Sequence, residues 1–184
     1  MARTWLSIRV ELVSGRGEEF WPRPGRVFAA ARSHSFGQLA DAINVCFARW
    51  DLAHMHSFTV ADGTQITPLD LWDGEAPEGS VDSEKAKLSR LVAGEQFAFV
   101  FDFGDDWSHL CTVAAERIDP IDVLGLLELP TEPMPYFGWG DLPDQYGRRW
   151  DTDDGTSPVP KRPTRALAEL PPLLPWWGPR QRGQ

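Results

Sequence analysis

Three carboxylates and an imidazole lie close together in the chain, at Asp102, Asp105, Asp106 and His109. Carboxylate oxygens are the ligands that hard cations prefer, and a carboxylate beside an imidazole can also serve general acid–base catalysis. Aspartate is equally common in tight turns, where its side chain accepts hydrogen bonds from nearby backbone N–H groups. Turn chemistry alone explains Asp105 and Asp106, so it is the favoured interpretation. Asp102 fits it less well, because it interrupts a strand of buried type.

Two histidines, His54 and His56, form a second candidate pair. Residues two apart on a strand face the same side, and imidazole is a common zinc ligand. The sequence supplies no third ligand for them. A packed histidine beside a histidine at a loop edge is therefore the favoured interpretation, and no metal or other cofactor is predicted.

A segment at residues 133–151 joins aromatic and charged side chains in a stretch rich in Pro and Gly. Its members are Tyr136, Phe137, Trp139, Asp141, Asp144, Tyr146, Arg148, Arg149 and Trp150. Trp, Tyr and Arg are favoured anchors of interfaces, but a long aromatic loop can also cover a core. Two interpretations stay open, a lid over the sheet and a binding surface.

Strands and one helix must position these residues. Apolar and polar residues alternate over residues 5–13, which predicts a half-buried strand, and a second strand is expected near residues 26–31. Ser35 and Gln38 match a capping box, and the apolar stripe that follows reaches Trp50. This pattern predicts one amphipathic helix.

The most distinctive segment is a predicted hairpin over residues 97–113. Phe97, Phe99, Phe101 and Phe103 are expected on one face of its first strand. Further strands are expected near residues 56–61 and 65. The order strand-strand-helix-strand-strand-strand predicts an α+β fold, in which one main helix crosses a single antiparallel or mixed sheet. A β-grasp-like arrangement is the expected form, followed by an irregular C-terminal segment and a tail.

Charge is distributed unevenly. The chain carries −9, whereas residues 159–184 hold five basic groups against one acid, so residues 1–158 carry −13. Such an acidic body repels a polyphosphate backbone, which disfavours nucleic-acid binding by the main domain. No apolar run is long enough to span a membrane, and the N-terminal residues lack the apolar region of a secretion signal. The two distant cysteines, Cys46 and Cys111, are typical of reduced, buried thiols, and a cytoplasmic location is expected.

Several stretches together resemble the plasmid pRiA4b ORF-3-like protein family, over about residues 5–116. They are residues 8–12, 20–23, 36–43 and 50–58, and above all 99–109, which contain Asp102-Phe103-Gly104-Asp105-Asp106-Trp107. The resemblance implies a compact domain similar to a β-grasp, a bacterial or archaeal source, and frequent carriage on plasmids or transposons. It implies no mechanism.

Two departures from the family pattern stand out. The family usually shows a Trp-Arg-Arg run after the first strand, whereas this chain reads Trp21-Pro22-Arg23. Many members continue with a Cys-Pro-Pro-Glu-Asp-Cys-Gly-Gly-like segment, which residues 133–150 replace here. The expected organisation is a family-like domain at residues 1–128, an aromatic segment that covers or extends it at residues 129–160, and a basic tail rich in Pro and Trp at residues 161–184.

The leading functional hypothesis is a non-catalytic binding or adaptor module with an unknown protein or small-molecule partner. Its candidate surface consists of Asp102, Asp105, Asp106, Trp107, His109, Trp139, Asp144, Tyr146, Arg148, Arg149 and Trp150. One rival is a metal-assisted hydrolase that uses the Asp102–His109 group. Another is a nucleic-acid-associated protein that relies on Arg148, Arg149 and the basic tail.

Overall fold

The computed structural model describes residues 5–148, 150, 152–158 and 160–161. Within these ranges the fold is α+β, with one nine-stranded, mostly antiparallel sheet and one main helix. The strands are β1 (Leu6–Gly15), β2 (Glu18–Glu19), β3 (Gly25–Ala30), β4 (His56–Thr59), β5 (Gln65–Thr67), β6 (Val81–Asp82), β7 (Gln96–Phe101), β8 (Trp107–Val113) and β9 (Met134–Trp139). The helices are α1 (Phe36–Cys46) and α2 (Pro120–Leu124), with 3-10 turns at Leu69–Leu71 and Leu88–Arg90.

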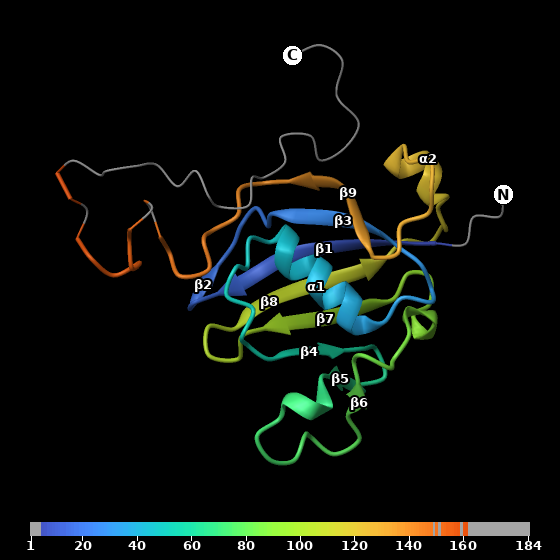
Figure 1. The fold of residues 1–184 in the computed structure, drawn as a ribbon, viewed down its shortest axis with the longest axis horizontal. Helices are drawn as coiled ribbons and strands as arrows, with labels where there is room; N and C mark the ends of the chain where they lie inside the picture. The colour runs from blue at the N-terminus through green and yellow to red at the C-terminus, as the bar shows by residue number, and fades with distance from the viewer. Residues whose placement is uncertain (1–4, 149, 151, 159, 162–184) are drawn as a thin grey trace, which may run out of the picture.

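The strand order along the sheet is β6-β5-β4-β7-β8-β1-β3-β9, and β2 pairs with β1. The β5–β6 pair is parallel, and the other described pairs are antiparallel. The predicted α+β class is confirmed, whereas the β-grasp-like form is not. Figure 1 shows α1 lying across one face of the sheet, with α2 at one edge beside β9.

The core lies between α1 and the sheet. Its strand members alternate along β1, β7 and β8, as a half-buried sheet requires. They include Ile8, Val10, Leu12, Phe97, Phe99, Phe101, Trp107 and Cys111, and they meet Phe36, Leu39 and Ile43 of α1. The capping box forms as predicted: the Ser35 side chain accepts from the backbone N–H of Gln38, and the Gln38 side chain accepts from that of Ser35. At 11 residues α1 is too short to cross a bilayer, and no other described helix is longer.

Two predicted elements end earlier than expected. The helix stops at Cys46 because Ala48 takes a left-handed conformation (φ 60°), so Trp50 lies beyond it and is 43% exposed. The first hairpin strand ends at Phe101 because Asp102 is also left-handed (φ 58°). Phe103 therefore leaves the core face on which it was expected and is 46% exposed.

The segment expected to be irregular contains a strand. β9 pairs antiparallel with β3 and extends the sheet by one strand. Its register shifts between Val27 and Phe28 of the partner strand, and Pro135 lies within it. Proline and a bulge both disturb the alternation by which a strand is recognised, which explains why sequence periodicity missed β9.

Candidate functional site

The chain just after α1 is held by a segment almost 100 positions further on. Gln145 is fully buried, and its side-chain oxygen accepts from the backbone N–H groups of Trp50 (2.9 Å) and Asp51 (3.0 Å). Its side-chain nitrogen donates to the carbonyl oxygen of Asp51 at 3.0 Å. One amide side chain therefore bonds the backbone as a neighbouring strand would. Residues 144–148 are in this way fixed against residues 50–54.

Asp144 reinforces the same contact. One carboxylate oxygen accepts from Trp50 Nε1 (3.0 Å) and from the guanidinium of Arg148 (2.9 and 3.1 Å). The other accepts from the backbone N–H groups of Tyr146 (3.0 Å) and Arg148 (2.9 Å). Burial alone would raise the pKa of Asp144, but these hydrogen bonds and the Arg148 charge lower it below its usual value. The Arg148 guanidinium also stacks over the Trp50 ring at 4.1 Å.

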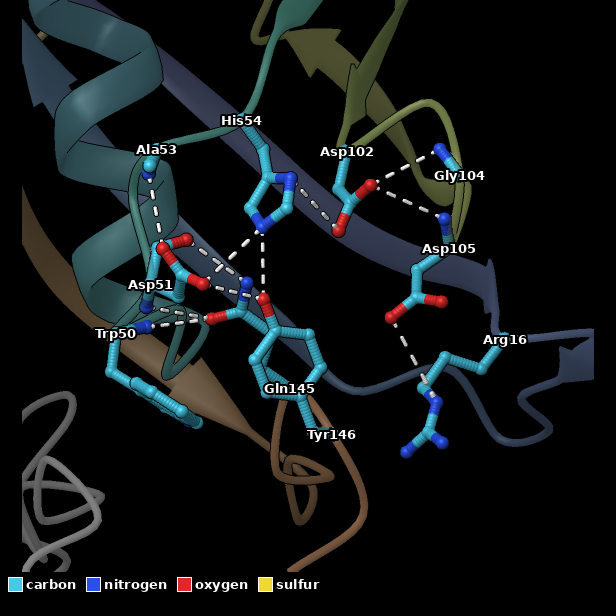
Figure 2. Close-up of polar contacts among 10 residues, drawn as sticks. All are labelled: Arg16, Trp50, Asp51, Ala53, His54, Asp102, Gly104, Asp105, Gln145 and Tyr146. Carbon is cyan, nitrogen blue, oxygen red and sulfur yellow. Dashed lines mark hydrogen bonds and ion pairs between the residues drawn. The ribbon is translucent and has the colours of Figure 1, made fainter. Parts of the chain in front are cut away.

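His54 joins this segment to the tip of the β7–β8 hairpin, as Figure 2 shows. Its Nε2 lies 2.8 Å from the Tyr146 hydroxyl and 3.4 Å from Asp51, and its Nδ1 lies 3.5 Å from Asp102. The Tyr146 hydroxyl donates to Asp51 at 2.7 Å. Burial, followed by the Asp51 carboxylate, raises the pKa of Tyr146 to about 12. The hydrogen bond from Tyr146 is the main cause that lowers the pKa of Asp51.

The three carboxylates of the hairpin tip contact different partners. Asp102 Oδ1 accepts from the backbone N–H groups of Gly104 (3.1 Å) and Asp105 (3.3 Å), as a turn-capping aspartate does. The Asp105 carboxylate lies 3.8 Å from the Arg16 guanidinium. The backbone carbonyl of Asp105 also accepts from the backbone N–H of Arg16 at 2.6 Å. Asp106 is exposed and accepts from the Ser108 hydroxyl at 2.9 Å. Turn chemistry therefore accounts for much of this cluster.

His109 lies on the core face of the hairpin, opposite Phe99 in the neighbouring strand. It is 2% exposed, its Nδ1 faces the Phe99 carbonyl at 3.3 Å, and its ring packs edge-on against Phe47. Burial, followed by the positive charge of Arg49, lowers the pKa of His109 to about 3. The structure therefore does not bring His109 to the carboxylates of the tip.

The two paired histidines also separate. His54 precedes β4 and faces Asp102, whereas His56 begins β4 and packs against Phe58 and Phe99. Burial lowers the pKa of His56 to about 4. Within the described ranges, no group of three or more His, Cys, Asp or Glu side chains is arranged to hold a metal ion.

A pocket of about 320 Å³ opens beside the Arg16–Asp105 pair. Its lining combines the β1–β2 hairpin, the start of β8 and the loop after β9: Gly15, Arg16, Glu18, Phe20, Trp107, Pro143, Asp144, Gly147 and Gly155. Trp107 is 1% exposed, and its ring is nearly parallel to that of Phe20. The pocket thus has an aromatic wall and both signs of charge.

Arg49 lies behind this aromatic wall. Its guanidinium is 3.5 Å from the centre of the Trp107 ring, and the residue is 2% exposed. Burial lowers the pKa of Arg49 to about 9, against the opposing charges of Asp144 and Asp105. None of its three side-chain nitrogens has a hydrogen-bond partner among the described residues. Among the described residues, the Trp107 ring is the group on which this guanidinium stacks.

Several predicted site residues gather and others do not. Asp102 and Tyr146 converge on His54, while Trp107 and Asp144 line the pocket. Trp139 lies on β9, where its Nε1 donates to the Arg23 carbonyl and Arg9 stacks on its ring at 4.4 Å. Trp150 is 7% exposed, and Arg149 lies outside the described residues.

Five important residues were missed as members of the site: Arg16, Arg49, Asp51, His54 and Gln145. His54 was singled out only as one half of a histidine pair. The positive charge of Arg49 gave no warning of burial, and Gln145 belongs to no sequence pattern. Only the fold reveals what they contact.

The comparisons with known proteins identify a family and add no function. The chain resembles a crystal structure titled "Protein of Unknown Function MM3350" from Methanosarcina mazei Go1, at 19% identity and a TM-score of 0.45. The match covers 71% of this chain and 61% of that protein, so the chain spans less than two thirds of its length. No curated protein matches. The model of the plasmid pRiA4b ORF-3-like protein family matches residues 6–123, and the chain therefore belongs to this family.

Proposed function

We propose that this protein is a non-catalytic binding module, which receives a cationic side chain of a protein partner in the pocket beside the hairpin tip. The observation that supports this most is the position of the pocket. It lies where the β8 start and the loop after β9 meet, and its volume of about 320 Å³ suits one side chain rather than a large ligand.

Charge and shape favour a cationic group. Glu18 lines the pocket, Asp105 lies next to it, and residues 1–158 carry −13, whereas Asp144 in the lining is already paired with Arg148. The one cation in the lining, Arg16, has Asp105 as a partner at 3.8 Å. The half-buried ring of Phe20, which is stacked on Trp107, offers apolar contact to an alkyl stem and a cation–π contact to its head. An acidic field also speeds the encounter with a basic partner.

The rival functions gain less support. The metal-assisted hydrolase requires His109 near Asp102, Asp105 and Asp106, yet His109 faces the core. The nucleic-acid hypothesis relies partly on Arg148, which is engaged by Asp144 and Trp50. Arg149 and residues 162–184 lie outside the described part of the chain. A cytoplasmic module carried on plasmids or transposons remains the expected context, and both cysteines are free.

N-acetyl-arginine methylamide is a suitable probe of the pocket, and its norleucine counterpart is the neutral control. We expect the arginine probe to bind the wild-type protein with a Kd in the millimolar range, since one side chain contributes roughly 4 kcal/mol. Glu18→Arg should weaken this binding about tenfold, because it reverses a charge in the pocket lining. Titration followed by nuclear magnetic resonance measures both affinities.

Glu19→Arg is the matched control, because Glu19 is the exposed neighbour of Glu18 in β2 and does not line the pocket. It should change the affinity less than about twofold, as long-range charge is screened by salt. If both variants weakened binding equally, the net charge of the protein would explain the loss, and Glu18 would have no specific role in the pocket. Failure of the arginine probe to bind, or equal binding of the norleucine probe, would contradict the proposal.

A further inference from the structure

A second groove lies along α1, away from the candidate site. It measures about 450 Å³ and is lined by Gln38, Asp41, Ala42, Val45, Cys46, Glu132, Pro133 and Pro135. The helical members recur at spacings of three and four, so they form one stripe along α1. Val45 is 55% exposed at this place, although it is a large apolar residue. The groove therefore presents apolar surface that the described residues leave uncovered.

The charged groups of this groove are both acidic. Asp41 and Glu132 are in the lining, and burial followed by the Glu132 charge raises the pKa of Asp41. The pKa of the nearby Glu84 is also raised, first by burial and then by the Asp41 charge. Carboxylates that destabilise one another's charge are stabilised by a cation placed between them. An occupant with apolar and basic groups would fit both properties of the groove.

The chain itself contains such a segment. Residues 162–184 lie outside the described residues, and their sequence combines four arginines with Pro171-Pro172-Leu173-Leu174-Pro175-Trp176-Trp177. The sixteen residues from Lys161 to Trp176 can span roughly 50 Å when extended. A domain of this size is roughly 35–40 Å across, so the segment can reach any of its faces. Tethering gives it an effective concentration in the millimolar range, at which even weak docking is populated.

We propose that residues 171–177 dock in the α1 groove of their own chain. Their Pro, Leu and Trp side chains cover Val45 and Pro133, and the flanking arginines lie beside Asp41 and Glu132. This docking is independent of the pocket that receives the partner. Docking removes the apolar surfaces of both the groove and residues 171–177 from water, and this burial is its main driving force.

Hydrogen–deuterium exchange of the full-length chain tests the docking. We expect the amides of Leu173, Leu174, Trp176 and Trp177 to exchange at least tenfold more slowly than in an unstructured peptide. Val45→Glu should abolish this protection, because it places a charge in the apolar groove. Val92→Glu is the matched control, since Val92 is 63% exposed and does not line the groove. It should leave the protection unchanged.

A second variant, Glu132→Lys, separates the ionic contribution from the apolar one. It should reduce the protection, and high salt should reproduce part of its effect in the wild-type chain. Absence of protection in the wild-type chain, or protection that survives Val45→Glu, would overturn the proposal. Protection that depends on protein concentration would show that the segment binds a second copy of the chain. Loss of protection in Glu18→Arg would show that it binds the pocket lined by Glu18. Either result also overturns docking in the chain's own groove.

Discussion

Replacement of Asp144 by Ala is expected to lower the free energy of unfolding by about 3 kcal/mol. The carboxylate accepts from Trp50 Nε1, from the Arg148 guanidinium and from two backbone N–H groups. Its side chain is only 2% exposed, so each of these donors loses a partner in a place that water reaches poorly. The Arg148 side chain is 23% exposed, and partial hydration of its charge keeps the loss near the lower end for a broken buried ion pair.

Urea denaturation measures this loss, with Asp141→Ala as the control. Asp141 is an exposed aspartate three positions earlier in the same loop, and its replacement should change stability by less than about 0.5 kcal/mol. A loss below about 1 kcal/mol for Asp144→Ala would show that residues 144–148 are not held against residues 50–54 in solution.

Gly15→Ala is expected to cost about 3 kcal/mol through overpacking. A Cβ atom at this position would lie 2.1 Å from Cε3 of the Trp107 ring, far inside van der Waals contact. The ring cannot move away easily, because the Arg49 guanidinium lies 3.5 Å from its centre and the residue is 1% exposed. The added methyl group must therefore displace either strand β1 or the aromatic wall of the pocket.

Gly17→Ala provides a stringent comparison in the same hairpin. Nothing lies within 4 Å of its added Cβ, but its φ of 76° is strained for alanine, at a cost of about 1 kcal/mol. Backbone strain alone would make Gly17 the more sensitive position, whereas ring contact makes Gly15 the more sensitive one. Thermal unfolding of the two variants shows which of the two positions is the more sensitive. A smaller loss at Gly15 would be evidence against the position of Trp107.

Local patterns in the sequence predicted much of the sheet and the helix. The alternation of Ile8, Val10 and Leu12 records their burial directly, and the Ser35–Gln38 box marks the helix start because both hydrogen bonds form within one turn. Strand β9 could not be predicted in this way. Its alternation is broken by Pro135 and by a register shift, and its partner β3 is more than 100 positions away.

The candidate site was only partly predictable for the same reason. The carboxylates of the hairpin tip were visible as a turn, but their link to Tyr146 passes through His54 from a third segment. The sequence does contain a signal for His109, because Trp107, His109 and Cys111 alternate along β8, and this alternation assigns His109 to the core face. Gln145 gave no signal, since nothing in an amide side chain indicates which backbone it will bond.

The proposed binding site requires residues 144–148 to lie against residues 50–54, and Tyr146 reports this contact directly. The chain has two tyrosines, so Tyr136→Phe leaves Tyr146 as the only one. Burial and the hydrogen bond to Asp51 raise the pKa of Tyr146 to about 12, compared with the ordinary value of 10.0. Between these values the folded state binds more protons than the unfolded state, so this contribution to stability declines as the pH rises through that window.

The decisive measurement is the near-ultraviolet absorbance of phenolate in Tyr136→Phe as the pH rises from 9 toward 12, while circular dichroism verifies that the fold persists. The contact predicts little phenolate at pH 10 to 11, and it predicts earlier ionisation in the Tyr136→Phe/Asp51→Asn double variant. Half-ionisation near pH 10 in the folded single variant, unchanged by Asp51→Asn, would contradict the arrangement on which the proposed binding site rests.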